Sequence, residues 1–167
     1  MIQLLFSYLL NCFILLLPVL IWNLIFYKKL PDLYQNKKWD NIPKGIKVVE
    51  NILRIFTFIF PLFLKLTLSS SIQCTGLIIY MAGIILYFMS WIMQIYFPET
   101  VWSRSMLGFM APAYTTIIWL SGISLIGQKM IFDLGYNFSI YLIISLLFVV
   151  IHTVRSFLVY NKNSSIE

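Results

Sequence analysis

The sequence predicts an all-α, polytopic membrane protein, on the strength of its composition, its uncharged runs and its helical periodicity. Of its 167 residues, 60% are hydrophobic, 17% aromatic and only 11% charged, and the mean hydropathy is +0.89. A soluble domain is about 45–50% apolar and about 25% charged. The composition therefore excludes a soluble globular protein, a disordered chain and a nucleic-acid-binding module. It predicts one transmembrane helical domain over residues 1–167.

Long uncharged runs mark the expected membrane-spanning helices, since about 20 apolar residues cross the roughly 30 Å hydrocarbon core. Four such runs each hold a full crossing. A fifth segment carries Glu50, Arg54 and Lys65 towards its two ends, where long basic side chains can reach the interface. We therefore predict a five-helix bundle, with a basic cytoplasmic loop over residues 28–46. The five spans are residues 4–27, 47–69, 73–97, 106–127 and 138–160.

The first span is expected to be retained in the protein rather than removed as a signal peptide. Residues 1–27 contain no charge, so no basic region precedes the apolar run, and no A-x-A-like cleavage site is present. The run is also longer than the roughly 7–15 apolar residues of a signal-peptide core.

The distribution of basic residues predicts the orientation of the spans. Ten of the 12 basic residues fall on one side of the predicted bundle, and Lys65 and Lys129 fall on the other. Since basic residues near span ends are retained in the cytoplasm, we expect an outside N-terminus, a cytoplasmic C-terminus and residence in the cell membrane. The ten on the inner side are Lys28, Lys29, Lys37, Lys38, Lys44, Lys47, Arg54, Arg104, Arg155 and Lys162.

Small and polar residues recur with helical spacing on the predicted spans. In the third span, six of them follow one another at intervals of three or four residues, which places them on one helix face. Lipid tails are as apolar as leucine, so membrane helices associate through close packing of small residues and through interhelical hydrogen bonds. We therefore expect this stripe to face the bundle interior. Its members are Gly76, Tyr80, Gly83, Tyr87, Ser90 and Gln94.

Ionisable and amide side chains concentrate near the predicted cytoplasmic ends of the spans. An ionisable group inside the bilayer costs about 2.5–3.5 kcal/mol on insertion scales, so it normally faces a partner or a water-filled cavity. Two interpretations stay open. Either the groups neutralise one another locally, as Glu50 and Arg54 at i, i+4 would, or the arginines surround an anion, with Glu50 and Glu99 orienting them. The candidate ligand-binding residues are Glu50, Arg54, Gln94, Arg104, His152 and Arg155.

Several kinds of chemistry lack their sequence motifs. The phosphate-binding G-x-x-x-x-G-K-[ST] loop, the dinucleotide motif G-x-G-x-x-G, the zinc motif H-E-x-x-H and the nucleophile motif G-x-S-x-G are missing. The single histidine cannot complete a metal site with the distant Cys12 and Cys74. We therefore expect no cofactor, no metal and no nucleic-acid partner, and we assign no catalytic residue.

Three functions fit these observations. The first is a non-enzymatic binding or transport-type protein that holds an anionic amphiphile, such as a membrane lipid with an anionic head group, or a partner. The second is a membrane-embedded lipid-modifying enzyme with His152 or Glu50 as general base. The third is an accessory subunit or immunity-type protein, for which we expect a dry, packed interior. Five helices are few for a transporter, so a homo-oligomer or a larger membrane complex is expected.

Overall fold

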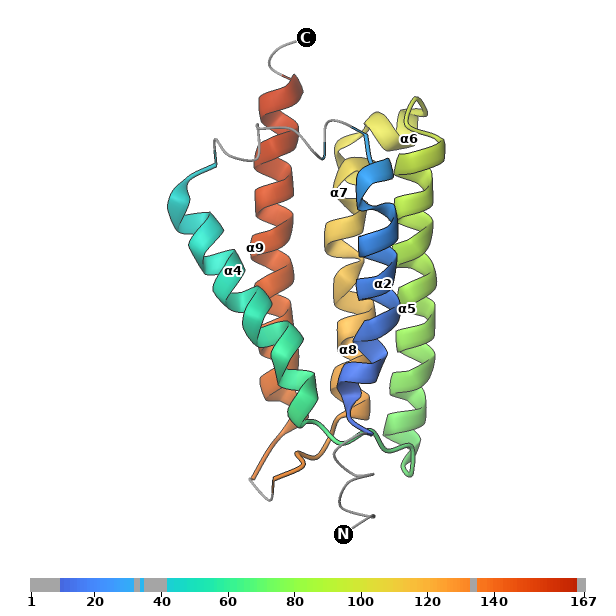
Figure 1. The fold of residues 1–167 in the computed structure, drawn as a ribbon, viewed down its shortest axis with the longest axis vertical. Helices are drawn as coiled ribbons and strands as arrows, with labels where there is room; N and C mark the ends of the chain where they lie inside the picture. Colours follow the sequence, from blue (N-terminus) through green and yellow to red (C-terminus); the bar gives the residue numbers. More distant parts are fainter. Residues whose placement is uncertain (1–9, 32–33, 35–41, 133–134, 165–167) are drawn as a thin grey trace.

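The computed structural model is a bundle of helices that pack side by side (Figure 1). It describes residues 10–31, 34, 42–132 and 135–164. Within these ranges the chain forms helices and no β-strand, which confirms the all-α prediction. Four helical segments are long and apolar enough to cross a membrane, and they identify an integral membrane protein. They are Cys12–Lys29, Ser71–Tyr96, Met106–Ile126 and Phe138–Lys162.

These segments are built from single helices or from short helices in series. In chain order the helices used below are η1 (Cys12–Leu16), α2 (Leu17–Phe26), η2 (Tyr27–Lys29), α4 (Lys44–Ile59), η4 (Phe60–Phe63), α5 (Ser71–Tyr96), α6 (Val101–Arg104), α7 (Met106–Tyr114), α8 (Thr116–Ile126) and α9 (Phe138–Ser164). The elements labelled η are 3₁₀ helices. Residues 4–9 of the first predicted span lie outside the described residues.

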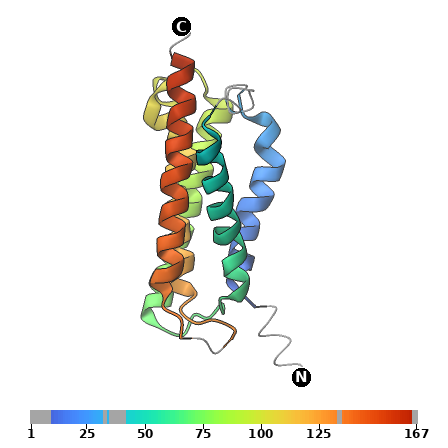
Figure 2. The ribbon, with the colours of Figure 1, turned by 90° about the vertical axis from the view of Figure 1, so that its left-hand side faces the viewer.

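The segment predicted as a span over residues 47–69 differs most from its prediction. Its helical part is α4 followed by η4, so the helix begins at Lys44 and ends at Phe63, and residues 66–69 belong to no helix or strand. It is not one of the four membrane-length apolar helices, because α4 carries four charged residues in its first three turns. It nevertheless runs along α9 between the two ends of the bundle (Figures 1 and 2).

Backbone pairing at one end of the bundle explains why this helix stops short. From Lys65 on, the backbone amides donate to two other connections instead of to the preceding helical turn. The amide of Cys12 donates to the carbonyl of Leu64 over 2.9 Å, and the amide of Lys65 donates to the carbonyl of Lys129 over 2.9 Å. Three connections, around residues 10–12, 63–66 and 129–131, are thereby tied together.

Each of the three span prolines coincides with an interruption of regular α-helix. Pro18 lies where η1 gives way to α2, and Pro61 lies within η4. Pro112 lies in α7, shortly before the break at Thr115 that separates α7 from α8. Proline lacks a backbone N–H and its ring clashes with the preceding turn, which accounts for the change of helix type next to Pro18 and Pro61. The break at Thr115 follows Pro112, and the clash with the preceding turn does not explain it. The single span predicted over residues 106–127 is therefore two helices in series.

The predicted polar stripe of the third span lies inside the bundle, since all six of its residues are buried in α5. Its glycines allow close contact with α8. A Cβ atom at Gly83 would lie 2.4 Å from the backbone nitrogen of Trp119, and one at Gly122 would lie 2.5 Å from the backbone nitrogen of Tyr80. The two helices thus approach so closely that a side chain at either glycine would meet backbone.

Two tyrosine hydroxyls from the same stripe hold the first segment, η1 followed by α2, against α5. Tyr80 donates to the backbone carbonyl of Leu15 over 2.8 Å, and Tyr87 donates to Oδ1 of Asn23 over 2.7 Å. Such interhelical hydrogen bonds stabilise helix pairs in lipid, where the hydrophobic effect contributes little. The α5 stripe therefore organises both α8 and α2.

We predict that Gly83→Ala destabilises the bundle by about 1–3 kcal/mol, the usual cost of forcing extra atoms into a packed interior. Gly45→Ala is the matched control, because no atom lies within 4 Å of a Cβ built there. The measurement is the unfolding free energy in detergent. Equal stability of the two variants would contradict the close α5–α8 contact.

Candidate functional site

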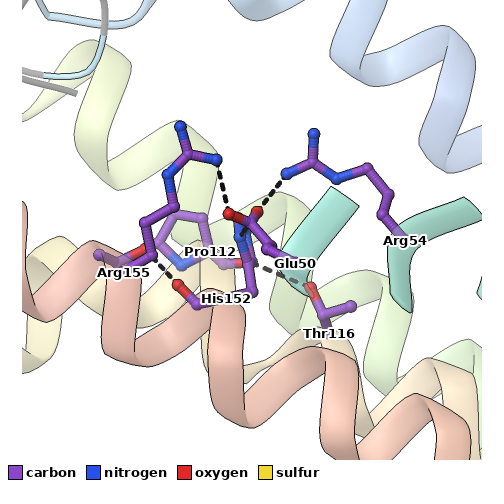
Figure 3. A network of polar contacts seen from close by, with 7 residues as sticks. Glu50, Arg54, Pro112, Thr116, His152 and Arg155 are labelled. Atoms are coloured by element: carbon purple, nitrogen blue, oxygen red, sulfur yellow. Dashed lines mark hydrogen bonds and ion pairs between the residues drawn. The ribbon is translucent and has the colours of Figure 1, made fainter. Parts of the chain in front are cut away.

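The centre of the candidate site is the carboxylate of Glu50, which is 0% exposed. Arg54, one turn further along α4, and His152 and Arg155 from α9 surround it (Figure 3). Its Oε1 lies 2.9 Å from Nδ1 of His152 and is ion-paired with Arg54, while Arg155 donates to its Oε2 over 2.5 Å. Four of the six predicted site residues, from segments more than 100 residues apart in sequence, therefore meet at one point.

Local helical spacing and interhelical packing together produce this meeting. Glu50 and Arg54 are four residues apart on α4, and His152 and Arg155 are three apart on α9, so each pair shares a helix face. Nearer the opposite end of the bundle, the hydroxyl of Tyr141 on α9 donates to the carbonyl of Thr57 on α4 over 3.1 Å. This bond fixes α4 against α9 and so brings the two pairs to the same level.

Basic groups outnumber acidic ones in the part of the cluster that the structure describes. One carboxylate there faces two guanidinium groups and the imidazole of His152. The side chain of Arg155 is mostly enclosed, whereas that of Arg54 is 44% exposed and uses one nitrogen for Glu50. Arginine has five N–H donors in a planar fork that matches carboxylate and phosphate. Arg54 is therefore the member best placed to receive an anion.

The imidazole of His152 is held in one orientation. It stacks on the ring of Phe148 with 5.4 Å between the ring centroids and 9° between the ring planes. Its Nδ1 is hydrogen-bonded to Glu50, and its second ring nitrogen makes no hydrogen bond to any residue that the structure describes. A carboxylate–imidazole pair of this kind orients a histidine for hydrogen bonding or proton transfer.

A cavity of about 650 Å³ lies beside the cluster. Of the described residues that line it, only Arg54 and His152 are basic and none is acidic. Its volume is within the roughly 300–1,000 Å³ that is usual for small-molecule sites. The wall is predominantly apolar and strongly aromatic. The aromatic members are Tyr27, Tyr34, Phe58, Tyr87, Trp91, Phe109, Trp119 and Phe148.

The wall of the cavity has a polar belt at the level of Arg54 and His152. On four different segments, a polar lining residue lies three or four positions, or about 4.5–6 Å, nearer to the end carrying Lys44 than an apolar one does (Figure 1). Apolar lining residues also lie on the other side of this belt, Leu30 and Phe109 among them. The pairs, polar residue first, are Asn23 and Leu20 on α2, Arg54 and Phe58 on α4, Thr116 and Trp119 on α8, and His152 and Phe148 on α9.

Two predicted site residues, Gln94 and Arg104, do not join the cluster, and this corrects the expectation that all six meet. The Gln94 amide donates to the carbonyls of Gly108 (2.8 Å) and Ser103 (3.4 Å), so it fixes the connection between α5 and α7. Arg104 forms an exposed ion pair with Glu99 at that connection. Glu99 therefore orients Arg104 and not the arginines around Glu50.

Comparison with known proteins adds no further information about this site. No family model, no curated protein and no solved structure matches the chain. Among the described residues, the fold and the site define an all-helical integral membrane protein with a mainly apolar cavity beside a basic cluster. The sequence did not assign the aromatic wall or Asn23 to a site, since aromatic residues at helical spacing are also what an ordinary core contains. The aromatic content of 17% was the available signal.

We predict that Glu50→Gln destabilises the protein by about 3–5 kcal/mol, the usual cost of removing one partner from a buried ion pair. The substitution removes the carboxylate that Arg54, His152 and Arg155 share. Unfolding free energy in detergent is the measurement, and Glu99→Gln is the control, because that carboxylate is exposed and paired at the surface. A Glu50→Gln protein as stable as the control would show that the buried carboxylate is dispensable.

Proposed function

We propose that this protein binds an anionic amphiphile in its internal cavity, as a binding or transport-type membrane protein. The observation that carries the proposal is that Arg54 and His152 belong both to the basic cluster and to the wall of a mainly apolar cavity. A carboxylate or phosphate would accept hydrogen bonds from Arg54, and the apolar part would lie one turn deeper against Phe58 and Phe148.

The proposal includes five crossings, with the basic end of the bundle in the cytoplasm. α4 and η4 would be the fifth crossing, with the charges of α4 satisfied within the cluster and at the interface. Lysines near this end follow α2, begin α4 and end α9, while Lys65 and Lys129 lie at the opposite end. Residence in the cell membrane and a homo-oligomer or larger complex stay predictions.

The distance of 2.9 Å between Glu50 and His152 also favours a second candidate, a lipid-modifying enzyme in which His152 acts as general base. The two candidates differ in what His152→Gln should do. In both cases the variant still binds the amphiphile. Only an enzyme would also convert the bound lipid to a product, and this conversion would be lost in the variant. The third candidate, an accessory or immunity-type protein, is expected to have a packed interior, and the cavity argues against it.

We predict that Arg54→Gln weakens binding of hexadecyl phosphate about tenfold or more, because a charge-assisted hydrogen bond is lost. Arg104→Gln, at the same end of the bundle but outside the cavity, should bind like the unaltered protein. Titration in detergent followed by native mass spectrometry measures both affinities.

Inorganic phosphate distinguishes an amphiphile site from a simple anion site. The proposal expects inorganic phosphate to compete poorly with hexadecyl phosphate, since it leaves the apolar part of the cavity unfilled. Equal affinity of the Arg54→Gln and Arg104→Gln variants, or efficient competition by inorganic phosphate, would count against the proposal.

For the orientation, we predict that a cysteine at position 29 (Lys29→Cys) resists a membrane-impermeant thiol reagent in whole cells, whereas Lys129→Cys is labelled. Both are made in a background in which Cys12 and Cys74 are replaced. Labelling at position 29 from outside the cell would reverse the proposed orientation.

A further inference from the structure

We infer that the ligand is a lipid of the surrounding bilayer that reaches the cavity sideways, between α2 and α4. This inference rests on the proposed function and specifies the source of the amphiphile and its route. It follows from how these two helices are attached, from where the cavity reaches the surface, and from what covers its basic end.

The two helices that flank the route are attached to different partners. Tyr80 and Tyr87 hold the η1–α2 segment against α5, whereas Tyr141 holds α4 against α9. At the far end of the bundle the first segment is joined to the chain after η4, where the amide of Cys12 donates to the carbonyl of Leu64. Both α2 and α4 line the cavity, so the space between them is bounded by side chains from both helices.

The cavity reaches the lateral surface of the bundle at α4. Ile55 and Ile59 line it, yet they are 57% and 47% exposed. On the first segment, the lining residue Tyr27 is also exposed. The two isoleucines are apolar side chains on a membrane-length bundle, and the medium they contact at this depth is lipid. An acyl chain can therefore pass from the bilayer into the cavity without crossing water.

Packed side chains cover the cavity towards its basic end. Leu30 lines it and is buried. The ring of Tyr34 stacks on Phe109 with 4.6 Å between centroids, and the Tyr34 hydroxyl donates to the Phe109 carbonyl over 2.8 Å. These contacts join the connection after α2 to α7. The side opening at Ile55 and Ile59 is therefore the more direct route for a membrane lipid.

Charge then selects among bilayer lipids. Arg54 directly precedes Ile55 on α4, so a head group that follows its chain through the opening meets the guanidinium. The preponderance of basic groups in the described part of the cluster favours a phosphate monoester or a carboxylate over a zwitterionic head group.

Brominated lipids test this inference, because bromine on an acyl chain quenches tryptophan fluorescence only at short range, and lipids of different head group can be compared at the same site. A variant that retains Trp119 alone, with the other four tryptophans changed to Phe, is placed in phosphatidylcholine vesicles. Trp119 is buried and lines the cavity, so a lipid that stays outside the bundle leaves its fluorescence unchanged. We expect dibrominated phosphatidic acid to quench it with an apparent affinity about tenfold above that of dibrominated phosphatidylcholine.

Two matched comparisons locate the route. A reporter tryptophan at Ile78→Trp, on the exposed face of α5, should be quenched equally by both lipids. Ile59→Phe should reduce the quenching of Trp119 by narrowing the opening. Ile52→Phe, equally exposed on α4 but not part of the cavity wall, should not.

If the single-tryptophan variant does not fold, the unaltered protein is photolabelled with phosphatidic acid that carries a diazirine on its acyl chain. Adducts on residues of the cavity wall are expected, and adducts confined to the outer helix faces would overturn the inference. Absence of Trp119 quenching by phosphatidic acid would overturn it as well. If hexadecyl phosphate still binds in detergent, only the lateral route has failed. If it does not bind, the proposed function has failed too.

Discussion

The burial of the Glu50 carboxylate is the constraint on which the rest of the structure depends. A carboxylate with no exposed surface on a helix among lipid-facing helices needs partners, and α4 itself supplies only Arg54. His152 and Arg155 supply the others, so α4 must lie against α9 at one level. Because α2 is attached to α5 instead, this arrangement leaves a space between the two pairs of helices. The cavity occupies that space, and part of the cluster forms its polar wall.

Hydrophobicity and periodicity predicted most of the fold. Uncharged runs located four of the helical segments, and the spacing of small and polar residues identified the buried face of α5 in full. The segment around Glu50 was the least well predicted, because the composition of residues 66–69 does not distinguish a helix end from a connection. The helix stops before them, and the backbone next to them pairs with residues 10–12 and 129–131. Pairing partners so distant in sequence leave no local signal.

The sequence predicted near which end of the bundle the candidate site lies, but not which residues meet there. Span direction places Gln94, Arg104, His152 and Arg155 near the same end, yet it does not give the rotation of each helix about its axis. The Gln94 amide donates its hydrogen bonds to carbonyls of the connection between α5 and α7, and Arg104 pairs with the nearby Glu99. Convergence of the other four depends on contacts such as the Tyr141–Thr57 hydrogen bond, which links residues 84 positions apart.

A double-mutant cycle between Glu50 and Arg155 tests the central claim most directly. Unfolding free energies are measured for Glu50→Gln, for Arg155→Gln and for the double variant. If the two side chains form one buried unit, the double variant loses less stability than the sum of the single losses, by about 1–3 kcal/mol. Losses of stability that simply add would mean that α4 and α9 are held together without this pair. The cavity could then not be attributed to the burial of Glu50.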